Sequence, residues 1–375
     1  MTPNTLRAAD HLVDQLVAQG IEAVFGVPGE SYLPVLDAFY GRERDIRFIT
    51  CRQEGGAAMA ADAYARLTGR PGVCFVTRGP GATNASAGVH VAFQDSTPMI
   101  LFVGQVARDQ RDREAFQEVD YRAMFAPLAK WAAEIDCVDR IPEYISHAFH
   151  VAQSGRPGPV VLAVPEDMLS SATEAIAVPV AVRPSGLAAQ ADVAAILERL
   201  NAASRPLIIA GGSGWSPEAA EALGRLAEKL EVPVGTSFRS QDYLDNRHRC
   251  YVGDVGIGIN PALADYVREA DTILSLGPRL GEITTSGYTL LKPPMADQTL
   301  LHVHPDPSEP GRVYRPDLSV AASAGQVVRQ LATAAGAPGR DRADWVAKGR
   351  RAYERWQEPL ETPGAVKMEP VSYTH

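Results

Sequence analysis

A glutamate that opens a run of small residues is the most informative chemical feature of the sequence. Glu54 lies at a predicted strand-to-helix junction and is followed by residues 55–65, most of which are glycine or alanine. A carboxylate in that position can relay a proton to a bound ligand. It can equally do no more than complement the positive end of a helix dipole, and the small residues can reflect close packing. Taken alone, the segment leaves both interpretations of Glu54 open.

Two glycine-rich turns and one polar segment supply further candidates. The turns are Gly26-Val27-Pro28-Gly29 and Gly79-Pro80-Gly81-Ala82-Thr83-Asn84, and the polar segment is Ala115-Phe116-Gln117-Glu118. Glycine has no β-carbon, so a flat heterocycle can approach the backbone there, although ordinary strand-to-helix turns also favour glycine. Thr83 and Asn84 can also be simple helix caps. Gln117 can equally belong to a solvated loop beside the charged run 108–114.

Alternating strands and helices must position these residues. The apolar pattern predicts strands over 23–27, 47–50, 73–77, 99–103 and 160–164. It predicts a first helix that Asn4 or Thr5 can cap and Gly20 can end, then helices near 32–40, 54–67, 82–92 and 141–153. This order favours an α/β fold, with a mainly parallel sheet flanked by helices on both faces.

A second unit of the same class follows a stretch rich in proline, valine and alanine near residues 179–188. Helices are predicted over 192–200, 218–230 and 262–269, and strands over 207–210, 232–235, 272–276 and 300–304. We therefore expect two domains, 1–178 and 189–335, and a linker over 336–375 that leads toward a further domain absent from the sequence. Val371 to His375 resembles a translated sequencing adapter, which indicates that the chain is truncated there.

Composition narrows the classes of partner. The 375 residues carry a formal charge of −9, which gives no electrostatic reason to expect nucleic acid or an anionic membrane. The four cysteines form no CxxC pair, so neither a zinc site nor a disulfide framework is indicated. No basic segment precedes an apolar one at the N-terminus, and no apolar run is long enough to span a membrane. We expect a cytoplasmic protein.

The order and spacing of these segments resemble the pyrimidine-binding domain of thiamine-diphosphate enzymes of the acetolactate synthase and pyruvate oxidase group. Asp95-Ser96-Thr97-Pro98 and the segment from Gly155 to Val160 extend the similarity, which spans nearly all of residues 1–335. The resemblance implies a thiamine-diphosphate-binding fold followed by a Rossmann-like central domain. It also implies a homodimer or tetramer.

The resemblance implies specific roles in the first domain. Glu54 would bind a ring nitrogen of the aminopyrimidine and favour its imino tautomer, so that the exocyclic nitrogen can deprotonate the neighbouring thiazolium carbon. Gln117, in Phe116-Gln117-Glu118, would face the substrate side of the thiazolium ring. The other expected cofactor-binding residues are Val27, Pro28, Gly29, Gly79, Thr83, Asn84 and Arg156.

The implied reaction is carboligation: decarboxylation of pyruvate and transfer of its hydroxyethyl unit to a second 2-keto acid. A decarboxylase of oxalyl or aryl keto acids shares Glu54 and is an alternative, as is a noncatalytic fragment that keeps only the fold. The family holds magnesium and the cofactor's diphosphate through a Gly-Asp-Gly segment and later paired asparagines, and this pair is absent. We therefore expect magnesium ligands only in the missing domain, and no metal ligands in this chain.

Acetolactate synthases also place FAD on the central domain. By resemblance, Arg156, residues 253–260 and the region of Asp306 would contact it. The sequence departs from the family's Arg-Phe-Asp-Asp-Arg motif, because it reads Arg279-Leu280-Gly281-Glu282-Ile283, so we expect weak FAD binding at most. His302 and His304 alternate along a predicted strand, and we expect them to end that strand rather than bind metal.

Overall fold

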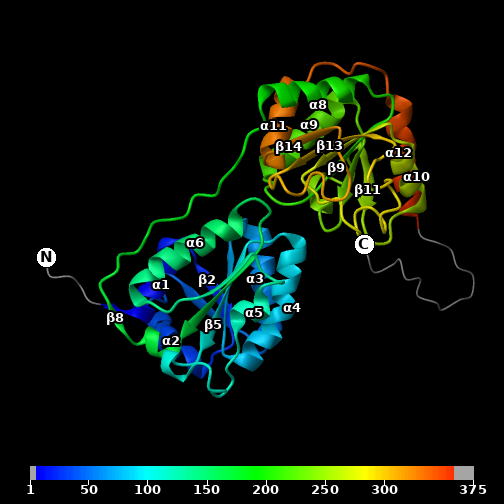
Figure 1. The fold of residues 1–375 in the computed structure, drawn as a ribbon. Helices are drawn as coiled ribbons and strands as arrows, with labels where there is room; N and C mark the ends of the chain where they lie inside the picture. Colours follow the sequence, from blue (N-terminus) through cyan, green and yellow to red (C-terminus); the bar gives the residue numbers. More distant parts are fainter. Residues whose placement is uncertain (1–5, 359–375) are drawn as a thin grey trace, which may run out of the picture. The chain divides into compact units, whose positions relative to one another are not determined.

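The computed structural model describes residues 6–358, which divide into two compact units between Pro184 and Ser185 (Figure 1). Each unit is built around a six-stranded sheet whose neighbouring strands all run parallel. This confirms the predicted α/β class with two helix-flanked parallel sheets. The predicted caps Asn4 and Thr5, and the segment from Val371 to His375, lie outside the described residues.

The first unit orders its strands β3-β2-β4-β5-β7-β6. The strands are β2 (Ala23–Gly26), β3 (Arg47–Thr50), β4 (Gly72–Val76), β5 (Met99–Gln105), β6 (Trp131–Glu134) and β7 (Pro159–Pro165). The helices are α1 (Ala8–Ala18), α2 (Leu33–Tyr40), α3 (Glu54–Thr68), α4 (Gly79–Asp95), α5 (Tyr121–Phe125), α6 (Ile141–Gln153) and α7 (Glu166–Leu169). A separate antiparallel pair joins β1 (Leu6–Arg7) to β8 (Ala172–Thr173).

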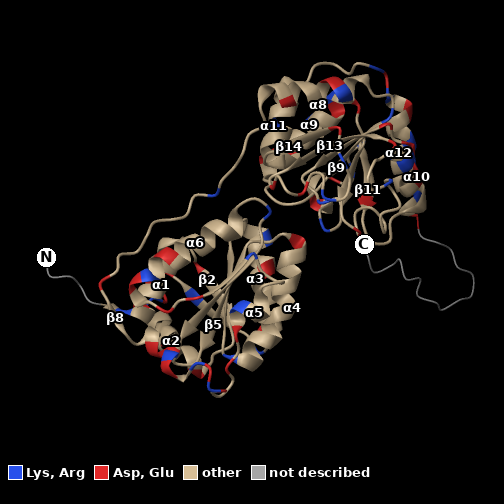
Figure 2. Ribbon diagram, in the orientation of Figure 1, with Lys and Arg blue, Asp and Glu red and all other residues tan. Residues whose placement is uncertain are grey.

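Alternate residues of the central strands pack on opposite faces of this sheet. Phe75 and Phe102 lie in the core formed with α1, α2 and α6, whereas Cys74 and Leu101 lie in the core formed with α3, α4 and α5. Both faces are covered, so β4, β5 and β7 are fully buried and carry no charged residue (Figure 2). That burial explains why these strands read as continuous apolar runs.

The second unit orders its strands β11-β10-β9-β12-β13-β14. They are β9 (Pro206–Ala210), β10 (Val234–Ser237), β11 (Tyr251–Val255), β12 (Thr272–Leu276), β13 (Thr299–His304) and β14 (Leu318–Ala321). The helices are α8 (Gln190–Ala202), α9 (Pro217–Leu230), α10 (Pro261–Glu269), α11 (Ala324–Ala334) and α12 (Ala343–Trp356). Relative to chain order, the strands run 3-2-1-4-5-6, which is the doubly wound Rossmann arrangement.

Two helix boundaries differ from the sequence-based expectation. Helix α1 begins at Ala8, because Leu6 pairs in β1 and Arg7 takes the N-cap position. Helix α4 begins at Gly79 rather than near residue 82, so the first turn of the helix includes Gly79-Pro80-Gly81. Proline is accommodated there, since the first-turn N–H groups have no intrahelical partner.

Part of the segment expected to be a linker packs on the second unit. Trp345 of α12 is buried, stacks on Tyr266 at a ring-centroid distance of 3.8 Å and donates its indole N–H to the carbonyl of Pro206. Val346 joins the core that contains α8, α9 and α11. Helix α12 is therefore an element of this unit. Within residues 6–358, no helix is both long and apolar enough to cross a bilayer.

Candidate active site

The carboxyl ends of β3, β2, β4 and β5 bring most of the candidate residues to one edge of the first sheet. Because these strands are adjacent and parallel, the segments that follow them share that edge. Glu54 follows β3, residues 27–29 follow β2, Gly79 follows β4 and Gln117 follows β5. Four segments that are distant in sequence therefore meet here.

The Glu54 carboxylate is directed at helix α4. Its Oε2 accepts a hydrogen bond of 3.0 Å from Nδ2 of Asn84, and the described residues provide no hydrogen-bond partner for Oε1. The N-cap of α3 is Gln53, whose side chain accepts the N–H of Gly56 at 2.7 Å. The half-buried Glu54 therefore does not cap its own helix, and one of its oxygens remains open to a ligand.

Close packing of α3 on α4 makes this contact feasible. A β-carbon added at Gly88 of α4 would lie 2.4 Å from the Cβ of Ala58 of α3. One added at Gly55 would lie 3.1 Å from the carbonyl oxygen of Asn84. The small residues after Glu54 therefore have a packing role, and that packing brings Asn84 to the carboxylate.

The loop that carries Gln117 is anchored to the start of α4. The carbonyl of Gln117 accepts the N–H of Gly79 at 3.1 Å, and Gln117 has a φ of 64°. Asp112 and Glu114 also have positive φ, a conformation that non-glycine residues adopt at a cost. Phe116, the neighbour of Gln117 in the chain, is 71% exposed.

Glu118 holds this loop together. Its carboxylate accepts the N–H groups of Asp112 at 2.8 Å and Ala115 at 3.1 Å, and it lies 3.3 Å from Nε of Arg111. The hydrogen bond from Asp112 and the neighbouring Arg111 keep the pKa of Glu118 below its usual range. These bonds fix the turn, and the contact with Gly79 holds Gln117 beside the start of α4.

Two family models match the chain. The model for the N-terminal TPP binding domain of thiamine pyrophosphate enzymes matches residues 6–124, and the model for their central domain matches residues 193–331. The chain belongs to the thiamine pyrophosphate enzymes. The TPP binding match covers Glu54, Asn84 and Gln117.

Curated relatives of this thiamine pyrophosphate enzyme are acetolactate synthases. The probable large subunit from Methanocaldococcus jannaschii is 32% identical over 336 residues, which are 88% of this chain and 56% of the relative. The large subunit from Parasynechococcus marenigrum is 35% identical over 327 residues, 85% of this chain and 52% of the relative. The acetolactate synthase from Bacillus subtilis is 31% identical over 316 residues, which are 84% of this chain and 54% of the relative. The chain spans about half the length of the curated relatives it matches.

The chain's own packing accounts for the glycines expected to line the thiamine site. A β-carbon at Gly29 would lie 2.5 Å from Cβ of Thr77, and one at Gly79 would lie 3.0 Å from the carbonyl oxygen of Gln117. The hydroxyl of Tyr32 donates to the carbonyl of Val27. Val27 and Gly29 are half-buried and Pro28 is exposed, so this turn borders the edge where Glu54 lies.

Thr83 is not a helix cap. It is exposed, and its hydroxyl donates to the carbonyl of Gly79 one turn earlier at 2.8 Å. The N-cap of α4 is Arg78, whose side chain makes no capping bond. Arg78 is buried, and its guanidinium donates to Glu30 at 2.8 Å. Arg78 was not among the residues singled out from the sequence. A charged residue between a buried strand and a glycine-rich turn could have indicated its buried position.

Arg156 does not join the residues around Glu54. It precedes β7, at the opposite edge of the sheet, where its guanidinium donates to the carbonyl of Phe93 at 2.6 Å and to Ser96 Oγ at 3.0 Å. It also stacks over the ring of Phe93 at 4.8 Å. In this structure, Arg156 stabilises the carboxyl end of α4.

The carboxylate of Glu54 suits the pyrimidine end of thiamine diphosphate. The open Oε1 of Glu54 suits a ring nitrogen that carries a proton. Within the described range 6–358, no group of three or more His, Cys, Asp or Glu residues could hold a metal ion. His302 donates from Nε2 to the carbonyl of Pro278 at 3.1 Å, and burial lowers its pKa to about 4. His304 accepts the N–H of Asp306 at 3.0 Å.

In the second unit, the loops at the switch point of the sheet pack against one another. Doubly wound sheets bind dinucleotides where the strand order reverses, which is here between β9 and β12. A β-carbon at Gly212 would lie 2.0 Å from the carbonyl oxygen of Gly277, so the two loops are in contact. Trp215 donates to the carbonyl of Gly211 at 2.8 Å, Tyr243 donates to that of Gly212 at 2.6 Å, and the two rings stack. These contacts join the loops that follow β9, β10 and β12.

Proposed function

We propose that the protein carrying this chain is a carboligase that decarboxylates pyruvate and couples the hydroxyethyl unit to a second 2-keto acid. The observation that carries the proposal is the Glu54 carboxylate, half-buried at the sheet edge and bonded through one oxygen to Asn84. The acetolactate synthases that resemble 84–88% of the chain support the choice of reaction.

Thiamine diphosphate, when bound, supplies the electron sink for decarboxylation. The chain's own residues orient it and move one proton. Glu54 binds a ring nitrogen of the aminopyrimidine through Oε1 and holds a proton there. Asn84 restrains Oε2 at 3.0 Å, so the carboxylate cannot rotate away. Positioned proton relays of this kind contribute about 100-fold to 10,000-fold to rate.

Gln117 contacts the 2-keto acid in this proposal. Its backbone is tied to Gly79 at the start of α4, and Glu118 holds the turn around it. The residues of 27–29 and Gly79 line the pyrimidine side, and Thr83 is an exposed residue one turn after Gly79 on α4. Arg156, which bonds to the carboxyl end of α4, is proposed to contact FAD rather than thiamine diphosphate.

The diphosphate and its magnesium are held by residues outside those described. A second copy of the chain is the expected partner, because α3 exposes large apolar side chains: Met59 is 47% and Leu67 is 88% exposed. We infer a cytoplasmic enzyme that uses neither nucleic acid nor membrane as partner and binds FAD weakly at most.

The test is the Glu54→Gln variant of the protein that carries this chain, assayed with pyruvate, thiamine diphosphate and magnesium. We expect turnover to fall at least about 100-fold with unchanged circular dichroism. Glu43→Gln is the matched control, since Glu43 is an exposed glutamate in the same unit, and should keep full activity. Formation of acetaldehyde instead of acetolactate would identify a decarboxylase, and near-normal activity of Glu54→Gln would overturn the role of Glu54.

A further inference from the structure

The segment 106–120 between β5 and α5, which carries Gln117, has a costly backbone conformation. Asp112, Glu114 and Gln117 have φ angles between 53° and 64°. Residues other than glycine adopt such angles at a cost, and they keep them only where the surrounding structure holds them there. The ring of Phe116 is mostly exposed, so its burial does not fix the segment. Polar contacts must therefore hold this loop in place.

A charged triad at the base of the loop is largely shielded from water. A terminal nitrogen of Arg111 bonds to the carboxylate of Glu134, and Nε of Arg111 lies 3.3 Å from Oε1 of Glu118. The side chains of Arg111, Glu118 and Glu134 are 20%, 12% and 10% exposed. Loss of one partner from such a group leaves a shielded charge without compensation, which is costly. Two carboxylates therefore fix the position of Arg111.

Glu134 ties the loop to the sheet. It is the last residue of β6, and its Oε2 lies 3.5 Å from Nε2 of Gln105, the last residue of β5. The fully buried Gln105 amide donates to the carbonyl of Val119 at 2.9 Å. The loop is thus held on both sides of Gln117, at Arg111 and at Val119. The brace of this loop consists of four side chains: Gln105, Arg111, Glu118 and Glu134.

The brace also fixes the turn that contains Gln117. Glu118, which Arg111 contacts, accepts two backbone N–H groups of the loop at 2.8 and 3.1 Å. The carbonyl of Gln117 accepts the N–H of Gly79 at 3.1 Å. Displacement of Arg111 would release Glu118, and with it the left-handed turn that holds Gln117 beside α4.

We propose that Arg111 and Glu134 are positioning residues for the carboligase reaction, because they hold the loop so that Gln117 meets the second 2-keto acid. This role rests on the proposed function, in which Gln117 contacts the 2-keto acid. Two pyruvates and a proton give acetolactate and CO2, whereas one pyruvate and a proton give acetaldehyde and CO2. Only the first reaction needs a second 2-keto acid to be held in place. The brace therefore determines how much of the hydroxyethyl unit is coupled and how much leaves as acetaldehyde.

The test is the double variant Arg111→Met/Glu134→Leu of the protein that carries this chain, assayed with pyruvate, thiamine diphosphate and magnesium. We expect the ratio of acetaldehyde to acetolactate to rise at least about tenfold, since a displacement of about 1 Å in a positioning group can cost about 100-fold. The KM for thiamine diphosphate should stay near that of the wild type, because Glu54 and Asn84 bond across α3 and α4.

Stability separates positioning from a general loss of structure. The double variant should keep a melting temperature near that of the wild type, because apolar side chains of similar volume often replace a buried ion pair without loss of stability. Each single variant should melt at a lower temperature, because it leaves one charge of the pair without its partner. Arg140→Gln is the matched control, since Arg140 pairs with Glu143 at 48% and 63% exposure, and it should leave the product ratio unchanged.

Hydrogen exchange in peptides from residues 106–120 reports the brace without any assay of activity. It should be at least about tenfold faster in the double variant than in the wild type. A wild-type protein that forms no acetolactate would overturn the carboligase function, and this role with it. If the wild type is active, an unchanged product ratio or an unchanged exchange rate in the double variant would overturn the role of Arg111 and Glu134 alone.

Discussion

The contact between α3 and α4 makes a sharp prediction about two glycines. We expect Gly88→Ala to destabilise the first unit and Gly56→Ala to stabilise it slightly, although both replace a helical glycine by alanine. A β-carbon at Gly88 would lie 2.4 Å from Cβ of Ala58 and 3.0 Å from backbone atoms of Ala58 and Met59. At exposed Gly56, the nearest atom is Oε1 of Gln53 at 3.7 Å, an ordinary contact.

The magnitude follows from these distances. Carbon atoms pack at about 3.8 Å, so the helices must separate by roughly 1.4 Å at this point, and the methyl group of Ala58 has no rotamer by which to move away. Overpacking of this kind costs about 1–3 kcal/mol, against a gain of up to about 1 kcal/mol from helix propensity. We expect Gly88→Ala to lose about 1–2 kcal/mol and Gly56→Ala to gain about 0.5 kcal/mol.

Differential scanning calorimetry should therefore show a melting temperature several degrees lower for Gly88→Ala than for Gly56→Ala, since 1 kcal/mol shifts a unit of this size by about 2–4 °C. Hydrogen exchange should speed up in peptides from α3 and α4 only for Gly88→Ala. The bond from Asn84 to Glu54 lies one turn away, and a separation of about 1 Å would break it. Equal stability of the two variants would refute the packing argument, and with it our account of how Asn84 reaches Glu54.

Three further perturbations test other parts of the chain. Burial raises the pKa of Asp254 to about 6, so folding favours its protonated form. The free energy of unfolding of the second unit should therefore fall as pH rises from about 4 to 6. Asp254→Asn should remove that slope in urea titrations and stabilise the unit above pH 6 by at most about 3 kcal/mol. The buried guanidinium of Arg342 donates to four backbone carbonyls at the ends of α8 and α9, so Arg342→Met should cost about 3 kcal/mol in the same titrations. Glu118→Ala removes two backbone hydrogen bonds from the Gln117 loop, so trypsin should cut after Arg113 at least about tenfold faster while the melting temperature changes little.

Much of the fold was predictable because the spacing of apolar residues in the sequence reflects which faces of the strands and helices are buried. The strand Arg47–Thr50 and the helix Ile141–Gln153 were predicted at their observed bounds. Three strands of the two sheets were missed: β6, β11 and β14. Strand β6 begins with Trp131 and lies at the sheet edge, where only four residues pair, and β11 contains Gly253 at a φ of 120°. Short edge strands and internal glycine weaken the apolar alternation on which the prediction depends.

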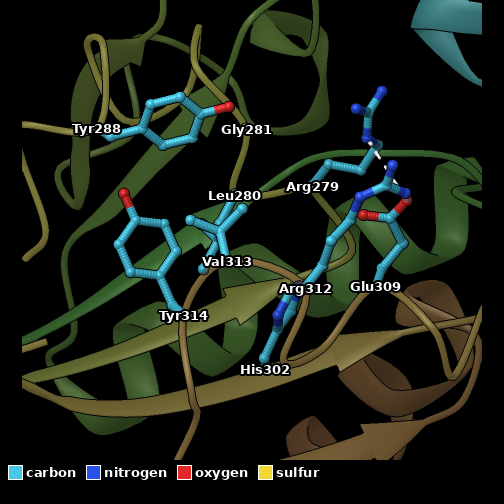
Figure 3. A pocket seen from close by; sticks show the side chains of 9 residues that line it. All are labelled: Arg279, Leu280, Gly281, Tyr288, His302, Glu309, Arg312, Val313 and Tyr314. Carbon is cyan, nitrogen blue, oxygen red and sulfur yellow. Dashed lines mark hydrogen bonds and ion pairs between the residues drawn. The ribbon is translucent and has the colours of Figure 1, made fainter. Parts of the chain in front are cut away.

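The site was less predictable, since roles depend on contacts across long sequence separations. Arg156 was expected by resemblance to contact FAD, and nothing in its sequence context indicated that it would bond to the carbonyl of Phe93 and to Ser96 at the carboxyl end of α4. A small hollow on the second unit is lined by Leu280 and Gly281 of one loop and by Arg312 and Tyr314 of another (Figure 3). Neither of these two loops has a periodic pattern in the sequence. Their positions therefore follow only from how they fold over β12 and β13.

The pair formed by Glu54 and Asn84 explains why local sequence left the glutamate ambiguous. Thirty residues separate the two side chains, and each on its own reads as an ordinary residue of a helix start. Their contact depends on a third residue, Gly88, which lets α4 approach Ala58 of α3. The glycines and alanines after Glu54 therefore cannot be divided into packing residues and site residues. The close packing sets the distance between the two helices, and that distance leaves one carboxylate oxygen bound to Asn84 and the other open to a ligand.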